Sequence, residues 1–266
     1  MTGWVKKVMF EQYKDIWQRR ELLYYLVVSD LKAQHRNKVL GFLWNFLNPL
    51  LLMGTYIVLV VFIFDMGGPK FPVLLFCAIL AWRWFTVSME RSVKSVTSKV
   101  SVVQTTRFPL AVLPLAMIMT GLVDYVAGFV ILIPLLFIFD ATWSVNVLWL
   151  PLLILVQLVG TIGASLICAV WGTYLSDWED ILQFVLRLWF YLSPILYSVS
   201  DRVPERYETV FWLNPFAALL ESYKNILVRG EPPSEYMVVP AAMAVMVFLI
   251  GSWYFAREER KLVKAI

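Results

Sequence analysis

Residues 39–64 read VLGFLWNFLNPLLLMGTYIVLVVFIF, a run of 26 positions without a charged residue. About 20 apolar residues in a helix cross the ~30 Å hydrocarbon core of a bilayer, so this run is long enough to span a membrane. Residues 144–175 and 236–256 are similarly long and apolar, residues 108–139 are interrupted only by Asp124, and the less clean spans 71–89 and 181–199 carry Arg83 and Arg187. The sequence therefore predicts an all-α integral membrane protein with six transmembrane helices.

Composition supports a single transmembrane domain over residues 1–266. Hydrophobic residues make up 60% of the chain and charged residues 16%, against about 45–50% and 25% in soluble domains. The six spans and their connections use nearly the whole chain, which leaves no room for a nucleotide-hydrolysing domain. Cys77 and Cys168 lie inside predicted spans, so we expect neither a disulfide nor a metal site. The net charge of +4 comes from basic residues beside the spans, and nucleic acid is not an expected partner.

Basic residues also predict the orientation. With the N-terminus inside, most of the 23 lysines and arginines fall in cytoplasmic segments, in accordance with the positive-inside rule. Both termini are therefore expected in the cytoplasm. Residues 4–31 precede the first span and have helical apolar periodicity, with Tyr13, Ile16 and Trp17 on the apolar side. Such a basic amphipathic helix lies along the headgroup plane, and it could also dock a cytoplasmic partner.

The first span carries a polar face. Its polar side chains, with Leu52 between them, fall within an arc of roughly 100° on a helical wheel; they are Asn45, Asn48, Thr55 and Tyr56. Amides are costly against lipid, so this face should meet either other helices or a water-filled path, and the two alternatives have equal weight. Pro49 predicts a kink or an early break in the helix.

The fifth span has a similar face, which contains Gln183, Arg187, Phe190, Pro194 and Tyr197. Pro194 should end the helix near the outer surface. In the outer segment, residues 200–235, a second amphipathic helix is expected to start with Asn214 as cap and Pro215 in its first turn. This helix either lies on the outer surface or belongs to a pair of short re-entrant helices.

Two ionisable residues are expected to have structural roles inside the membrane. Asp124 is the only carboxylate deep in a span, and a lone carboxylate fits a hydrogen bond or a pair with Arg83 better than a proton relay. Residues 90–107, between spans two and three, are basic and rich in hydroxyls. They form either a solvated turn or a short helix that touches a partner.

In the fourth span, small residues at four-residue spacing predict close helix packing; they are Gly160, Ala164, Cys168 and Gly172.

The sequence gives little support to an enzyme. The single histidine, His35, lies in a basic juxtamembrane segment, and Asp177, Glu179 and Asp180 fit a polar cytoplasmic turn better than a metal site. No G-x-x-x-x-G-K-S/T motif is present, so the chain does not bind nucleotide phosphates as a P-loop does. A secondary transporter would be expected to show repeated broken helices, and the sequence contains no such repeat.

Several short motifs, taken in order, resemble the membrane subunits of ABC-2 type exporters, and most closely the branch that exports O-antigen, capsule or teichoic-acid polymers. These motifs are SDLK at 29–32, LGFLWNFLNPL at 40–50, TRFP at 106–109, LPL at 113–115, LVDY at 122–125, YLSPILY at 191–197 and LNPF at 213–216. The resemblance covers almost the whole chain. Ser29 and His35 depart from the arginine and the aromatic residue that are common in the family.

The resemblance implies a homodimer in the bacterial cytoplasmic (inner) membrane, with a separate ATPase subunit bound to each copy. That partner would hold ATP and Mg, and this chain would bind no cofactor. The expected cargo is a lipid-linked polysaccharide, with a drug or a small lipid as the alternative. In the family, spans one and five line the export path, and residues after span five form re-entrant helices. The candidate path residues, most of them on these spans, are Asn45, Asn48, Thr55, Tyr56, Gln183, Arg187, Phe190, Tyr191, Tyr197 and Trp212.

In the family, the loop between spans two and three meets the ATPase together with the N-terminal helix. Candidate contacts of this chain with the ATPase subunit are Arg19, Arg20, Ser95, Ser98, Lys99, Gln104, Asp177 and Glu179. Closure of two ATPase subunits against these residues would rock the two copies of the membrane subunit. Membrane lipids complete the expected set of partners.

Overall fold

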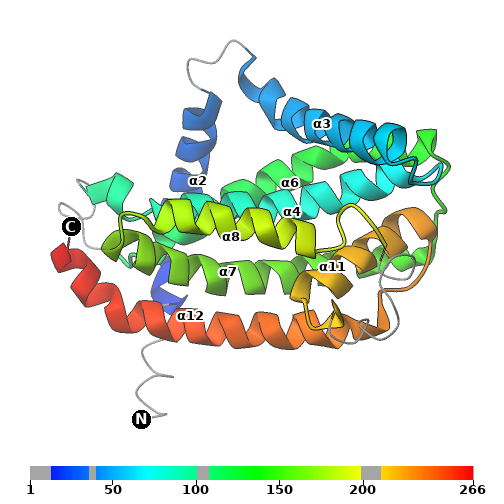
Figure 1. The fold of residues 1–266 in the computed structure, drawn as a ribbon. Helices are drawn as coiled ribbons and strands as arrows, with labels where there is room; N and C mark the ends of the chain where they lie inside the picture. The colour runs from blue at the N-terminus through cyan, green and yellow to red at the C-terminus, as the bar shows by residue number, and fades with distance from the viewer. Residues whose placement is uncertain (1–12, 36–39, 101–107, 199–210, 266) are drawn as a thin grey trace.

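The computed structural model describes residues 13–35, 40–100, 108–198 and 211–265, and helices dominate this part of the chain. Most of them lie side by side in one bundle (Figure 1). The principal helices are α2 (Arg20–His35), α3 (Trp44–Ile57), α4 (Phe71–Val93), α6 (Val112–Ile138), α7 (Leu150–Tyr174), α8 (Trp178–Leu192), α11 (Pro215–Lys224) and α12 (Val238–Ala265). Short helical turns extend several of them, at Gly41–Leu43, Val58–Ile63, Val145–Trp149, Asn225–Arg229 and Glu235–Met237.

Five helical stretches of the described residues are long and apolar enough to cross a bilayer. They are Gly41–Ile63, Phe71–Val93, Val112–Ile138, Val145–Tyr174 and Glu235–Lys264. Each coincides with a predicted span within a few residues, except that the last one continues as helix well beyond residue 256. The first stretch remains helical through Pro49, so the early break is not observed.

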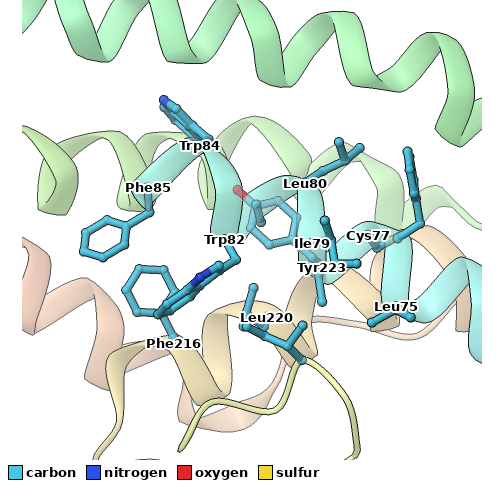
Figure 2. Close-up of a cluster of buried hydrophobic side chains, with 14 of the residues drawn as sticks. Leu75, Cys77, Ile79, Leu80, Trp82, Trp84, Phe85, Phe216, Leu220 and Tyr223 are labelled. Atoms are coloured by element: carbon cyan, nitrogen blue, oxygen red, sulfur yellow. The ribbon is translucent and has the colours of Figure 1, made fainter. Parts of the chain in front are cut away.

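The second span, α4, is the centre of the bundle. In its most apolar window 72% of the residues are buried, against 11% in the first span. Figure 2 shows Trp82 of α4 beside Phe216 of α11, and Tyr223 of α11 near Ile79 of α4. The helix was predicted to give way to a loop at residue 90, but it continues to Val93 because Ser92 and Val93 are buried against neighbouring helices. The connecting segment therefore starts at residue 94, with a short helical turn at Thr97–Lys99.

The fifth predicted span is shorter than expected. Helix α8 has 15 residues, which corresponds to about 22 Å and is less than the hydrocarbon core. It ends at Leu192 because Pro194 disfavours helical geometry at the residue before it, and Ser193 is accordingly extended, with φ −100° and ψ 150°. The predicted break at Pro194 is thus confirmed.

Helix α11 packs inside the bundle. Its first turn is beside the middle of α4: the ring centroids of Phe216 and Trp82 are 5.0 Å apart, and those of Phe216 and Phe85 are 4.6 Å apart. The predicted cap is confirmed, because the side chain of Asn214 accepts a hydrogen bond from the Phe216 amide at 3.0 Å. Gly230, with φ 73°, ends the helical turn that follows α11. From Phe71 to Trp82, α4 rises about 16 Å, so α11 reaches well below the outer end of the bundle.

The N-terminal helix runs across the bundle rather than along it (Figure 1). It is helical from Tyr13, apart from a turn at Arg19, and the Tyr13 hydroxyl is 2.6 Å from the Ser252 hydroxyl of α12. Burial raises the pKa of Tyr13, so its phenol stays protonated. The helix buries Ile16, which is 7% exposed, whereas Trp17 next to it is 72% exposed. The apolar face assigned from the sequence is thus split: one part packs on protein and the other part points away from it.

Helices α7 and α12 approach each other closely at glycines. A β-carbon at Gly163 would collide with the backbone of Val247 and Phe248, and one at Gly251 would collide with Gly163. Gly160 and Gly172 of the predicted small-residue stripe also face neighbours, Ala244 and Val93 respectively. The predicted close packing of this helix is confirmed, although its tightest point lies at a glycine outside the stripe.

Candidate functional site

A pocket of about 310 Å³ opens between α3, α4 and α8. We call it the central pocket. The walls come from three segments that are distant in the sequence. Its lining residues are Leu52, Tyr56, Ile79, Trp82, Arg83, Thr86, Val87, Glu90, Gln183, Leu186, Arg187, Phe190 and Tyr191.

Five predicted path residues meet in this pocket: Tyr56, Gln183, Arg187, Phe190 and Tyr191. The rings of Tyr56 and Phe190 are stacked with centroids 5.3 Å apart, and Tyr191 packs edge-on against Phe190 at the same distance. Stacked aromatic faces are the surface on which sugar rings can slide without being held by fixed charges. The pocket thus joins an aromatic wall to polar side chains of α8.

Helix α4 contributes a polar stripe that the sequence reading did not assign to the path. Arg83, Thr86, Val87 and Glu90 are partly exposed, whereas most of the residues around them in this helix are buried. Their spacing of three, four and seven residues places them on one face of the helix. All four line the central pocket. The same spacing, read together with the polar residues at positions 83, 86 and 90, could have identified this face from the sequence.

Two arginines in the central pocket have no ionic partner among the described residues. No carboxylate there lies within ion-pair distance of Arg83 or Arg187. An arginine at the centre of a transmembrane helix costs about 2.5–3.5 kcal/mol on insertion scales, and such residues face protein or water rather than lipid. The opening of both side chains into the pocket is consistent with this cost.

Asp124 contacts side chains of α3 and α4. It accepts a hydrogen bond from the Asn45 side chain at 2.8 Å, which agrees with the structural hydrogen bond expected for it. Its ion pair is with Arg91, at 3.6 Å, and not with Arg83 as considered from the sequence. Arg91 reaches Asp124 because α4 continues beyond its predicted end. Asn45, Arg83 and Asp124 also line one small pocket between α3, α4 and α6.

The remaining path candidates lie elsewhere. Asn48 and Thr55 are exposed on α3, and the Thr55 hydroxyl donates to the Leu51 carbonyl at 2.9 Å. Trp212 is buried, with its ring stacked on Tyr236 at 4.7 Å. Tyr197 lines a second and larger space. The structure therefore brings together about half of the predicted path residues.

This second space, the outer pocket, has a volume of about 1120 Å³. One wall is formed by the end of the first span and residues 64–71, and the others are formed by the turn 195–198 and the end of α11. Its walls are largely apolar, with Lys70, Lys224 and Arg229 among them. This pocket could not be predicted from the sequence, because it forms only when three segments distant in the chain converge.

A buried lysine fixes α11 beneath the outer pocket. Lys224 is 2% exposed, and its ammonium group donates to the carbonyls of Pro194, at 2.5 Å, and Tyr197, at 2.9 Å. Glu221 lies 3.6 Å from Lys224 and also pairs with Arg229. The residues that follow the break in α8 are thus tied to α11 by charged hydrogen bonds. Lys224 belongs to the predicted outer segment, residues 200–235, and α11 carries it into the protein.

The candidate ATPase contacts gather at the end of the bundle opposite α11 (Figure 1). Arg19, Arg20, Ser98 and Asp177 are exposed there, and Gln104 lies outside the described residues. The other three candidates have contacts within the chain, as do Ser98 and Asp177. Lys99 lies 3.4 Å from Asp30, Glu179 lies 2.5 Å from Lys94, and Ser95 is buried and donates to the Ser92 carbonyl.

The fold and its pocket define a membrane-embedded helical subunit, and the chain belongs to the ABC-2 type transporter family, whose model matches residues 21–228. Among its relatives is the O-antigen export system permease protein RfbA of Myxococcus xanthus, 30% identical over 260 residues, which are 97% of this chain and 100% of the relative. Two proteins of the same name from Klebsiella pneumoniae are each 27% identical over 247 residues, 92% of this chain and 95% of the relative.

Proposed function

We propose that this chain is the membrane-spanning permease subunit of an ABC transporter that exports a lipid-linked polysaccharide. The observation that carries the proposal is the central pocket, where Tyr56, Phe190 and Tyr191 form an aromatic wall in a chain of the ABC-2 family. The names of the relatives support an O-antigen-like polymer as the cargo.

Two copies of the chain would enclose the path. The first span is only 11% buried, and α8 exposes Gln183 and Arg187 beside the central pocket. A polymer path needs walls on every side, and a second copy related by two-fold symmetry would supply the missing one. The homodimer and the two ATPase subunits, one on each copy, are parts of this proposal.

The architecture of the proposed permease has six spans and a re-entrant helix. Helix α8, which is too short to cross alone, would span the bilayer together with residues 193–198, the turns that follow it. Helix α11 would dip back from the outer surface, in agreement with its contact with the middle of α4. Both termini would then lie in the cytoplasm, and the protein would reside in the inner membrane of a bacterium.

The energy would come from the partner. ATP and Mg would be bound and hydrolysed in the separate ATPase subunit, which would dock at the bundle end that exposes Arg19, Arg20 and Ser98. The Lys94–Glu179 pair joins the end of α4 to the start of α8, so a push at this end would act on two walls of the central pocket.

Reconstitution tests the proposal. The chain is co-expressed with candidate ATPase subunits, the complex that copurifies is placed in vesicles, and hydrolysis is measured with lipid-linked polysaccharide, with the lipid alone and with small amphiphilic drugs. We expect the lipid-linked polymer to stimulate hydrolysis and to cross the membrane. Stimulation by the drug or the bare lipid without any response to polymer would refute polysaccharide export.

A further inference from the structure

Two arginine side chains line the central pocket, and the passage of a neutral polymer does not explain their presence there. Arg83 lies at the middle of α4, on the polar stripe, and Arg187 lies on α8. Both line the central pocket, and within the part of the chain that the structure describes neither forms an ion pair or a side-chain hydrogen bond. A sliding neutral glycan needs no such charges, so their position indicates a ligand of opposite sign.

The carboxylates nearby attract Arg83 electrostatically, but neither forms an ion pair with it. Asp124 has Arg91 as its ion-pair partner at 3.6 Å. Glu90 lines the same pocket but lies seven residues after Arg83 on α4, about 10 Å further along the helix axis. The lining of the central pocket therefore has two positive side chains, Arg83 and Arg187, and one negative side chain, Glu90, so its net charge is positive.

The chemistry of the two side chains favours phosphate. A guanidinium group presents a planar set of donors that binds phosphate oxygens in a bidentate manner, and it stays charged in a poorly hydrated pocket. Tyr56 and Phe190 lie in the same pocket and provide a ring surface beside the arginines. A volume of about 310 Å³ is sufficient for a phosphate or pyrophosphate group with an adjoining sugar.

We propose that Arg83 and Arg187 form a binding site for the phosphate linkage that joins lipid to sugar in the cargo. This inference rests on the proposed function and adds to it: span two, through Arg83, contributes to substrate recognition. The phosphate would lie between the two guanidinium groups while the first sugar stacks on the aromatic wall. The site would thus bind the anionic end of the cargo, and the aromatic rings would bind the neutral polymer.

Equilibrium binding of radiolabelled farnesyl pyrophosphate to the purified permease–ATPase complex tests the site. Farnesol, which has the same hydrocarbon chain without phosphate, is the ligand control. We expect Arg83→Gln and Arg187→Gln each to weaken farnesyl pyrophosphate binding about tenfold to hundredfold, the loss associated with a charge-assisted hydrogen bond. Arg83→Lys should show an intermediate loss because it keeps the charge and loses the fork. Farnesol binding should not change.

Arg257→Gln is the matched protein control, because this side chain is 60% exposed on α12 and lies outside the central pocket. It should bind farnesyl pyrophosphate as the unmodified chain does. Copurification with the ATPase and an unchanged elution profile show that each variant is folded. Equal binding of farnesyl pyrophosphate and farnesol to the unmodified complex, or undiminished binding in both glutamine variants, would overturn the inference.

Competition separates the possible sources of phosphate. Inorganic pyrophosphate should displace the probe from the unmodified complex, as expected for recognition of the phosphate group. Phosphatidylglycerol, added at the same concentration as pyrophosphate, should not displace the probe. If it does, and if this displacement is abolished in Arg83→Gln, the site binds bulk lipid headgroups, and the assignment to cargo is overturned. A complex that exports polymer but whose arginine variants bind the probe normally refutes only the site. A complex that binds the probe through the arginines but exports no polymer refutes only the proposed function.

Discussion

Replacement of Lys224 by methionine should loosen the attachment of α11. Methionine has a similar length and is apolar, so the cavity stays filled while the donors to the carbonyls of Pro194 and Tyr197 are lost. A hydrogen bond to a charged group contributes about 1.5–3 kcal/mol, so two bonds correspond to about 3–6 kcal/mol. Arg229 remains paired with Glu221, which prevents the additional cost of an isolated buried carboxylate. The expected loss is therefore about 3 kcal/mol, at the lower end of that range, or about a hundredfold in the local opening equilibrium.

The chain contains a natural reporter for this opening. Cys77 is buried in α4 close to Lys224, and Cys168 is buried in α7. With a thiol-reactive dye and a Cys168→Ser background, labelling of Cys77 reports exposure of the α4–α11 contact. Lys224→Met should label about a hundredfold faster than the parent below the temperature of global unfolding.

Lys70→Met is the matched control, because it removes the same charge from the wall of the same outer pocket. Lys70 is only partly buried, and we expect a change in stability below about 0.5 kcal/mol. Equal labelling rates in Lys224→Met and in the parent would refute the reasoning that these hydrogen bonds fix α11.

Two further substitutions test the packing and the intramembrane polar contact. Gly163→Leu should prevent the close approach of α7 and α12 and abolish recovery of folded protein. Gly54→Leu is the control, because a β-carbon there meets no atom within 4 Å, and this variant should be recovered normally. Similar yields of monodisperse protein from the two variants would contradict the packing argument. Asp124→Ala removes the partner of Arg91 and the acceptor of Asn45, and should lower the thermal midpoint in detergent by several degrees, corresponding to about 2–3 kcal/mol; Asp124→Asn keeps the hydrogen-bond acceptor and should lose less, so equal losses in the two variants would contradict this account.

Hydropathy, together with prolines and capping residues that mark the ends of helices, predicted most of the fold. Apolar runs with at most one or two charged residues predicted five long helices to within a few residues at most ends, because insertion in a membrane depends on local apolar length. Pro194 and Asn214 predicted the end of α8 and the start of α11 through backbone geometry and capping, which are local properties. The end of α4 was missed, because burial against other helices, rather than local composition, extends the helix to Val93.

Contacts between helices could not be predicted from the sequence. Polar residues at helical spacing identified Tyr56 and Gln183 as members of faces unsuited to lipid, and both line the central pocket. The partner of Asp124 depends on the register of α4 against α6, which no pattern within one helix determines. Lys224 falls in the predicted outer segment, residues 200–235, where a lysine is rarely buried, and the carbonyls freed at the break in α8 explain its buried position.

The central claim is that the aromatic wall of the central pocket guides an exported polysaccharide. The direct measurement is polymer on the cell surface in a strain that depends on this permease, together with ATP hydrolysis by the purified complex. The combined variant Tyr56→Ala, Phe190→Ala and Tyr191→Ala should export little polymer while its ATPase subunit still copurifies and hydrolyses ATP. Phe62→Ala, at a ring that is 77% exposed on the first span, should export normally. Full export by the triple variant would contradict the claim.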